Sequence, residues 1–188
     1  VVAEDHMGHG KSLDENGVRG YFHGGWFAAI EDTCQLMKDT MAEYPGVPFV
    51  LLGHSMGSFL VRTMLMKFPK CGISAAILSG TAWMHRGVIN TGLAAATLVC
   101  KTKGEKTHDK MLNNLMFGSY NRRVEHKRTD FDWLTRDASC VDAYIADPLC
   151  GFTVTAGLVR DMLTGLRTIQ EPENLGKMRK DIPVLFIS

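Results

Sequence analysis

A serine lies at an abrupt change of secondary structure in the stretch FVLLGHSMGSFLVRTMLMKFP, residues 49–69. The apolar run at 49–52 is typical of a short strand that is buried on both faces. From Met56 onward the apolar residues recur at helical spacing, and Pro69 ends that pattern. The chain must therefore turn from a strand into a helix at Ser55, which forces this residue toward a strained backbone conformation.

A strained conformation at a non-glycine residue costs about 1–3 kcal/mol and indicates a functional need. Here the turn lifts the Ser55 hydroxyl above the sheet and directs the Met56 backbone N–H toward whatever is bound to that oxygen. Gly53 and Gly57 have no Cβ, which allows the strand and the helix to pass close together. We therefore predict a nucleophile elbow, with Ser55 as the nucleophile and the Met56 N–H as an oxyanion-hole donor.

Simpler interpretations also exist for this segment. Ser55 could lie in an ordinary strand–helix turn and only cap the helix that follows. His54 is adjacent to the proposed nucleophile, and its side chain should therefore point elsewhere. We interpret His54 as a packed, hydrogen-bonded histidine rather than as a catalytic base.

Strands and helices alternate along the chain. Apolar runs predict strands at residues 1–3, 49–52, 73–79 and 182–188, and one apolar helix face is marked between residues 26 and 44. Alternation of this kind indicates an α/β protein with a parallel, doubly wound sheet and right-handed crossovers.

An insertion of about a hundred residues precedes the last strand, far more than a usual connection between elements. We predict that residues 81–170 form a helical cap or lid, and that residues 1–80 and 171–188 form the core. Within the cap, helices are predicted at 93–101, 110–117, 138–146 and 153–168.

Several apolar residues of the insertion have two interpretations. They could line a pocket for an acyl chain, or they could only pack the cap helices onto the domain. For any single residue the second interpretation is favoured. These residues are Trp83, Leu112, Leu115, Met116, Phe117 and Phe152.

The composition excludes several classes of protein. A net charge of +1 gives no reason to expect a nucleic-acid partner. The five cysteines are scattered and lack C-x-x-C spacing, so we expect reduced thiols in the cytoplasm and no metal site. The longest weakly polar run, residues 88–100, is too short to span a bilayer.

Four segments together carry a resemblance to a known family. They are DHMGHGKS (5–12), LLGHSMGSF (51–59), FDWLTRD (131–137) and ADPLCGFTVTAG (146–157). The chain resembles the monoacylglycerol lipase and lysophospholipase-like α/β-hydrolases, a group also labelled serine aminopeptidase S33 or hydrolase-4. The elbow is shared with the wider superfamily, whereas the last two segments are specific to this branch. The resemblance implies an α/β-hydrolase fold in which a helical cap is inserted after the strand that follows the nucleophile helix.

The resemblance also implies a function. It indicates hydrolysis of carboxylic esters of lipid-like alcohols through an acyl-serine intermediate, without a cofactor. The expected partner is a small lipid-like ester, and the cap is expected to touch a membrane surface transiently. Two alternatives stay open: an acyltransferase or thioesterase that uses the same serine, and a non-catalytic binding protein. The intact elbow argues against the last of these, because strain without chemistry is hard to maintain.

The catalytic triad is incomplete in this chain. In the α/β-hydrolase fold the triad follows the order serine, then acid, then histidine. In the family, the acid follows the strand that here lies at 182–188, and the histidine comes later still. We therefore expect an internal part of a longer enzyme, with the triad Asp and His and a second oxyanion N–H outside it. The histidines after the elbow, and the acids considered with them, all lie in the insertion: His85, His108, His126, Asp109 and Glu125.

Two further motifs have structural interpretations. Asp5 is expected to hold a turn through side chain–backbone bonds, in a loop that also contains His9. Gly8 and Gly10 would permit the conformation of that loop. Asp147 precedes a proline within the insertion, so we expect it to form a turn or a helix start rather than to serve as the triad acid.

Overall fold

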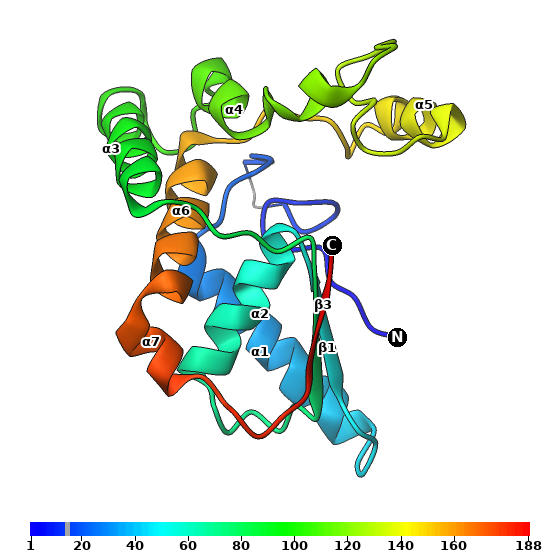
Figure 1. Cartoon of the computed structure of the whole chain (residues 1–188), viewed down its shortest axis with the longest axis vertical. Helices are drawn as coiled ribbons and strands as arrows, with labels where there is room; N and C mark the ends of the chain where they lie inside the picture. Colours follow the sequence, from blue (N-terminus) through cyan, green and yellow to red (C-terminus); the bar gives the residue numbers. More distant parts are fainter. Residues whose placement is uncertain (14–15) are drawn as a thin grey trace.

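A computed structural model describes residues 1–13 and 16–188 of the chain. In Figure 1 the lower layer consists of helices packed on a small sheet, and an upper layer of helices extends over one end of that sheet. The helices are α1 (Gly25–Glu43), α2 (Met56–Lys67), α3 (Arg86–Lys103), α4 (Lys110–Phe117), the 3-10 helix η1 (Tyr120–Arg123), α5 (Ala138–Ala146), α6 (Ala156–Gln170) and α7 (Pro172–Lys177). The strands are β1 (Val50–His54), β2 (Ala75–Ser79) and β3 (Val184–Ile187).

The sheet of the described residues is parallel and has the strand order β1-β2-β3. Val50 of β1 pairs with Ala75 of β2, and Ala76 of β2 pairs with Val184 of β3. The insertion leaves the sheet after β2 and returns before β3. The predicted parallel α/β sheet is therefore confirmed.

The core lies between the sheet and three helices. Helix α2 contacts β1, β2, α1 and α6, so it is surrounded on several sides. Accordingly Leu60, Met64 and Leu65 are almost completely buried. This environment explains why the apolar residues of α2 outnumber those of a typical surface helix, which carries a single apolar stripe.

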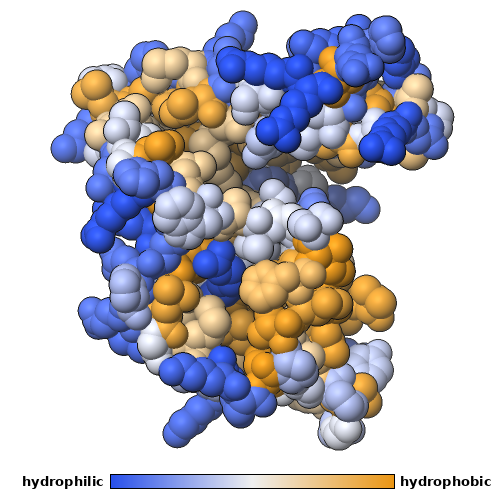
Figure 2. Space-filling view, viewed as in Figure 1, coloured by the Kyte–Doolittle hydropathy of each residue, from blue (hydrophilic) through white to orange (hydrophobic). Residues whose placement is uncertain are grey.

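The opposite face of the sheet carries exposed apolar side chains. Val50 and Leu52 of β1 share a face with Leu185 and Ile187 of β3, because side chains alternate along strands and the paired residues are in register. All four are about half exposed or more. Figure 2 shows this surface as a continuous hydrophobic area beside the sheet.

Residues 1–3 do not form the predicted strand. Val1 and Val2 are exposed, and none of the strands among the described residues pairs with this segment. A strand exists only where a neighbouring strand supplies the hydrogen-bond ladder. A short apolar run in the sequence does not show whether such a neighbour is present, so this prediction is wrong.

The helix boundaries follow the capping residues. Helices α4 and α5 begin and end where the sequence predicts. Helix α3 begins earlier, at Arg86, because His85 caps it by accepting the Gly87 N–H at 3.2 Å. Helix α6 begins later than predicted, because Thr155 caps it through its hydroxyl. The short helices η1 and α7 are absent from the sequence prediction.

Helix α6 joins the cap to the core. It contacts α3 and α4 on one side and α1 and α2 on the other. A Cβ at Gly165 would lie 2.1 Å from the Trp26 ring, so this glycine permits the close contact of α6 with α1. The division into a core and an 81–170 cap stays a prediction, and α6 is shared between the two parts. No described helix is both long enough and apolar enough to cross a bilayer.

Candidate active site

Ser55 occupies the turn between β1 and α2. Its φ of 49° and ψ of −118° make it the one described non-glycine residue with a positive φ. An L-residue adopts this conformation only when the surrounding structure enforces it. The backbone therefore has the strain that the strand–glycine–serine–glycine–helix pattern predicts.

Gly53 has the expected role, whereas Gly57 has a different one. A Cβ at Gly53 would lie 2.4 Å from the Gly57 carbonyl oxygen and 2.7 Å from a Val61 methyl group. A Cβ at Gly57 would meet no atom within 4 Å. The helix thus passes close to the strand through the backbone of Gly57. The expectation that Gly57 must lack a side chain for this approach is wrong.

Three hydrogen bonds fix the turn. The Ser55 N–H donates to the Ser79 carbonyl at 2.9 Å, which ties the elbow to the end of β2. The Ser55 carbonyl accepts from the Ser58 N–H at 2.9 Å and from the Ser58 hydroxyl at 2.6 Å. Ser58 is completely buried. Sequence reasoning missed Ser58 and Ser79, although a serine in the first turn of a helix is a known signal for local backbone bonding.

The Ser55 side chain is accessible to solvent. Ser55 is exposed at the carboxyl end of β1, and its hydroxyl forms no hydrogen bond with any described residue. The adjacent Met56 is the first residue of α2, so its N–H has no acceptor within the helix. An oxyanion on a group bound to Ser55 would lie beside this unsatisfied donor and the positive end of the helix dipole.

His54 is hydrogen-bonded but not packed. Its Nδ1 lies 3.0 Å from the Ser79 hydroxyl, yet the residue is exposed. The expected hydrogen bond is confirmed, and the side chain is open to solvent because His54 ends β1. A Cβ at Gly80 would lie 3.2 Å from the His54 ring, so a larger residue there would crowd it.

The histidines of the insertion do not reach the elbow. His85 caps α3, and His108 Nδ1 lies 2.5 Å from the Thr153 carbonyl. His126 is exposed. Neither these three residues nor any other histidine among residues 1–13 and 16–188 forms a hydrogen bond with Ser55.

The acids of the insertion have structural positions. Asp109 is buried and caps α4 by accepting the N–H groups of Met111 and Leu112. Lys103 donates to its other oxygen at 3.0 Å, and this bond with the cap bonds holds the pKa of Asp109 below its usual value. Glu125 is exposed.

Asp147 forms a turn, as expected. Its side chain accepts the Leu149 N–H at 2.8 Å, and its carbonyl accepts the Cys150 N–H at 3.0 Å. The residue is also the C-cap of α5, so the chain leaves the helix there. The carboxylate of Asp147 thus serves the local turn.

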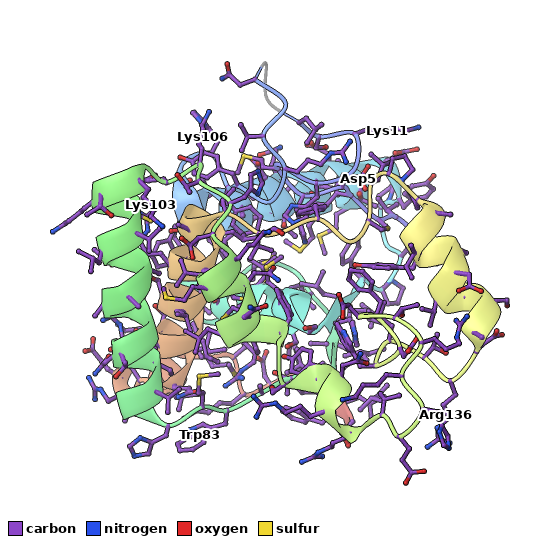
Figure 3. All side chains as sticks on the ribbon, turned by 90° about the horizontal axis from the view of Figure 1, so that it is seen from above. Asp5, Lys11, Trp83, Lys103, Lys106 and Arg136 are labelled. Carbon is purple, nitrogen blue, oxygen red and sulfur yellow. The ribbon has the colours of Figure 1, made fainter. Side chains whose placement is uncertain are left out.

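The loop at 5–12 is held as the sequence predicts. Asp5 accepts the Lys11 N–H at 2.9 Å, and Gly8 and Gly10 have positive φ angles. Figure 3 shows Asp5 and Lys11 close together at one side of the molecule. His9 lies against Phe22 and Phe152 and its Nδ1 is 2.9 Å from the Met7 carbonyl, while burial lowers its pKa.

The apolar residues of the insertion do not form one group. Leu112 is completely buried and therefore serves packing. Trp83 and Leu115 are 71% and 58% exposed. Met116, Phe117 and Phe152 are partly buried. An acyl pocket that involves the partly buried residues stays a prediction. Figure 2 shows a recess between the cap layer and the end of the sheet.

A charged cluster forms around Arg160. Arg160 contacts Glu105 at 2.5 Å and Asp161 at 3.0 Å, and the Tyr21 hydroxyl donates to Glu105 at 3.1 Å. Burial raises the pKa of Asp161. These residues line a cavity of about 460 Å³ that also involves Trp26, and another cavity of about 340 Å³ lies beside Asp5. No group of three or more potential ligands among the described residues could hold a metal ion.

Comparison with known proteins places the whole chain in one group. Residues 1–188 match the family described as serine aminopeptidase, S33. The chain is 32% identical to the monoglyceride lipase of Mus musculus over 149 residues, which are 79% of this chain and 42% of that protein. It is 31% identical to a monoacylglycerol lipase of Mycolicibacterium smegmatis over 165 residues, which are 87% of this chain and 51% of that protein. The chain thus spans about half the length of these curated relatives.

Solved structures show the same fold. A thermostable carboxyl esterase from Bacillus coagulans, in complex with glycerol, superimposes with a TM-score of 0.83 and 26% identity, covering 96% of this chain and 58% of that one. A soluble variant of monoglyceride lipase from Saccharomyces cerevisiae, in complex with a substrate analogue, gives a TM-score of 0.70 at 18% identity, with coverages of 97% and 56%. The second similarity supports the fold alone. Together they confirm the α/β-hydrolase fold.

Proposed function

The chain belongs to the serine aminopeptidase, S33 family of α/β-hydrolases, and from this premise we propose that the protein is a serine hydrolase of lipid-like carboxylic esters. The observation that carries the proposal is the strained backbone of Ser55, which presents an exposed hydroxyl at the end of the sheet. The names of the relatives, monoglyceride lipases and a carboxyl esterase, support an ester of glycerol or a similar alcohol as the substrate.

The proposed reaction has two acyl-transfer steps. Ser55 Oγ forms a bond with the ester carbonyl carbon, while its proton passes to a histidine. The Met56 N–H donates to the oxyanion that forms, and one such donor contributes about 3–4 kcal/mol to transition-state stabilisation. The bond to the alcohol then breaks, and the alcohol leaves with the proton. Water attacks the acyl-serine, and the acid is released as Ser55 regains its proton.

The base and the acid that orients it are part of this proposal. The histidines of the described residues lie in other hydrogen bonds or at exposed positions, away from bonding contact with Ser55. We therefore assign the triad Asp and His to sequence outside these 188 residues. The second oxyanion donor is assigned there as well.

The cap and the location of the protein complete the proposal. The 81–170 segment acts as a lid whose partly buried side chains, such as Phe117, contact the acyl chain. Exposed apolar residues on α4, Met111 and Leu115, support transient contact of this lid with a membrane surface. All five cysteines are free thiols, which supports a cytoplasmic location.

The test uses the protein that carries this chain, an active-site serine phosphonate probe and p-nitrophenyl esters. We expect Ser55→Ala to abolish labelling and to lower kcat by up to about 10⁶-fold, the scale for a triad that acts as a unit. Ser139→Ala, at an exposed serine in α5, is the matched control and should keep wild-type rates. A Ser55→Ala protein that keeps more than about a tenth of the activity would rule out this nucleophile. Analysis of products then separates free acid from acyl transfer to an added alcohol.

A further inference from the structure

Two segments connect the core to the cap, and one side chain joins them. We call residues 81–85 and 169–171 the cap stem. The Met84 N–H donates to Gln170 Oε1 at 2.9 Å, and Gln170 Nε2 donates to the Met84 carbonyl at 2.8 Å. The carboxamide thus satisfies both backbone groups of Met84, as a neighbouring strand would. The start and the end of the cap are therefore linked at its base.

A second side chain holds both segments from the core. Arg62 of α2 donates through Nη1 to the Thr81 hydroxyl at 3.3 Å and to the Ala82 carbonyl at 3.2 Å. Its Nη2 donates to the Ile169 carbonyl at 3.4 Å. This carbonyl belongs to the last turn of α6, where unpaired carbonyl groups carry partial negative charge. One guanidinium group therefore contacts both halves of the cap stem.

The environment of Arg62 favours a positioning role over incidental packing. The guanidinium is half-buried, and burial lowers its pKa. Its three acceptors are neutral oxygens and not a carboxylate. Burial of a cation carries a desolvation cost unless hydrogen bonds compensate for it. The acceptors of the cap stem supply that compensation, so Arg62 and the stem depend on each other.

The first stem segment is held mainly by hydrogen bonds to its main chain, and Met84 also packs against the core. Trp83 lies between Ala82 and Met84, the two residues whose main chains are bound, yet it is 71% exposed. In Figure 3 its ring projects from the edge of the molecule. Burial of Trp83 therefore does not hold this segment, whereas the packing of Met84 and the hydrogen bonds from Arg62 and Gln170 do.

The nucleophile and the cap stem are connected through α2. This helix begins at Met56, directly after Ser55, and Arg62 lies within two turns of its start. The neighbouring residues Leu60, Val61 and Met64 are buried, so this part of the helix is firmly packed. The orientation of the stem relative to Arg62 is thus also its orientation relative to the nucleophile.

We propose that Arg62 and Gln170 are positioning residues that lock the cap stem onto the nucleophile helix and so set the opening between the cap and Ser55. The catalytic consequence of this lock rests on the proposed function, whereas the existence of the lock does not. Loss of these hydrogen bonds should widen the recess between the cap and the sheet, or make its width more variable. Long acyl chains, which need contacts in the cap, should lose more from this change than acetyl esters do.

The structural part is tested by hydrogen–deuterium exchange in the protein that carries this chain. Gln170→Met keeps the side-chain length and removes both bonds. The Met84 amide itself loses one hydrogen bond, so we expect amide exchange in residues 82–86 to rise by up to about tenfold. Gln170→Glu keeps an acceptor for the Met84 N–H and should give a smaller rise. The matched control is Gln35→Met, at an exposed helical glutamine that bonds to Asp39 within α1.

Arg62→Lys provides an independent variant that keeps the positive charge but loses the fork geometry. It should raise exchange in residues 82–86 as well, while exchange in β1 stays at the wild-type rate. Arg167→Met is its control, at an exposed arginine of the same α6 end. If exchange in 82–86 is unchanged in both Gln170→Met and Arg62→Lys, the lock does not exist and the inference is wrong.

The functional part is tested by chain-length selectivity. For Gln170→Met, we expect the ratio of kcat/KM for p-nitrophenyl laurate to that for the acetate to fall about fivefold to tenfold, mainly through KM. Faster exchange together with an unchanged ratio would mean that the lock is structural only, and the positioning role would be overturned. An inactive wild-type protein would instead contradict the proposed function, and the exchange result would still decide whether the lock exists.

Discussion

At the scale of single residues, the elbow combines strain with close approach. Ser55 adopts its positive φ because the strand and helix on either side are fixed, and Ser58 binds the Ser55 carbonyl from the buried side. At Gly53, β1 and α2 approach too closely to leave room for a Cβ. Two neighbours thus support the strained turn. Gly53 leaves room for the helix because it has no Cβ, and Ser58 supplies hydrogen bonds.

The two elbow glycines should respond differently to the same substitution. Gly53→Ala places a Cβ 2.4 Å from the Gly57 carbonyl, so we expect a loss of about 1–3 kcal/mol in the free energy of unfolding. Gly57→Ala meets open space and replaces a helical glycine, so a gain of up to about 1 kcal/mol is expected. Urea unfolding of both variants measures the difference. Equal destabilisation would contradict the assignment of the close contact to Gly53.

At the scale of elements, helices α4, α5 and α6 each begin at an N-cap residue whose side chain accepts a free backbone N–H of the first turn. Asp109 caps α4, Asp137 caps α5 and Thr155 caps α6. Asp109 is the buried carboxylate of this set and also binds Lys103. Asp109 therefore connects the end of α3 to the start of α4. It should contribute more to the free energy of unfolding than an exposed N-cap residue does.

Removal of the Asp109 side chain, the N-cap of α4, should change the free energy of unfolding by an amount that depends on pH. Asp109→Ala is expected to cost about 1–2 kcal/mol of unfolding free energy at pH 7. The folded-state pKa of Asp109 lies below its unfolded value, so this stabilisation is present above the unfolded pKa and is lost as the pH falls through the folded one. Urea unfolding at pH 7 and at acidic pH checks this trend. A difference that grows toward acidic pH would contradict the assignment.

At the scale of the whole molecule, two exposed apolar surfaces lie on different parts of the fold. One is the open face of the sheet around Leu52 and Leu185. The other is on α4, where Met111 and Leu115 are one turn apart on the same side and both are more than half exposed. Only the second belongs to the proposed lid, so the two surfaces can be distinguished by substitution.

Binding to vesicles should depend on the α4 surface. We expect Met111→Glu combined with Leu115→Glu to reduce sedimentation with anionic phospholipid vesicles about tenfold or more, because a buried apolar side chain contributes about 1.5–3 kcal/mol. Leu185→Glu, on the sheet face, is the control and should bind as the wild type does. If Leu185→Glu abolishes binding and the α4 variant does not, the lid is not the contact surface.

The sequence was informative wherever a local pattern determines the structure. The strained backbone at Ser55 and the limits of α4 and α5 depend on neighbouring residues, and their predictions are confirmed. The strand expected at 1–3 depended on a partner strand that no local pattern can show. Arg62 and Gln170 were missed for the same reason, since their contacts join residues far apart in the sequence. The roles of Ser55 and Met56 in catalysis stay predictions.

The cap stem has a consequence for protein engineering. Arg62 and Gln170 grip it mostly through carbonyl and amide groups of the main chain, at Ala82, Met84 and Ile169. Because nearly all amino acids have the same main-chain groups, these hydrogen bonds depend little on the sequence inserted between the two segments. Replacement lids of unrelated sequence could therefore be grafted between residues 85 and 155, which leaves α6 and its contacts with α1 and α2 in place, and each would inherit the same attachment to the core.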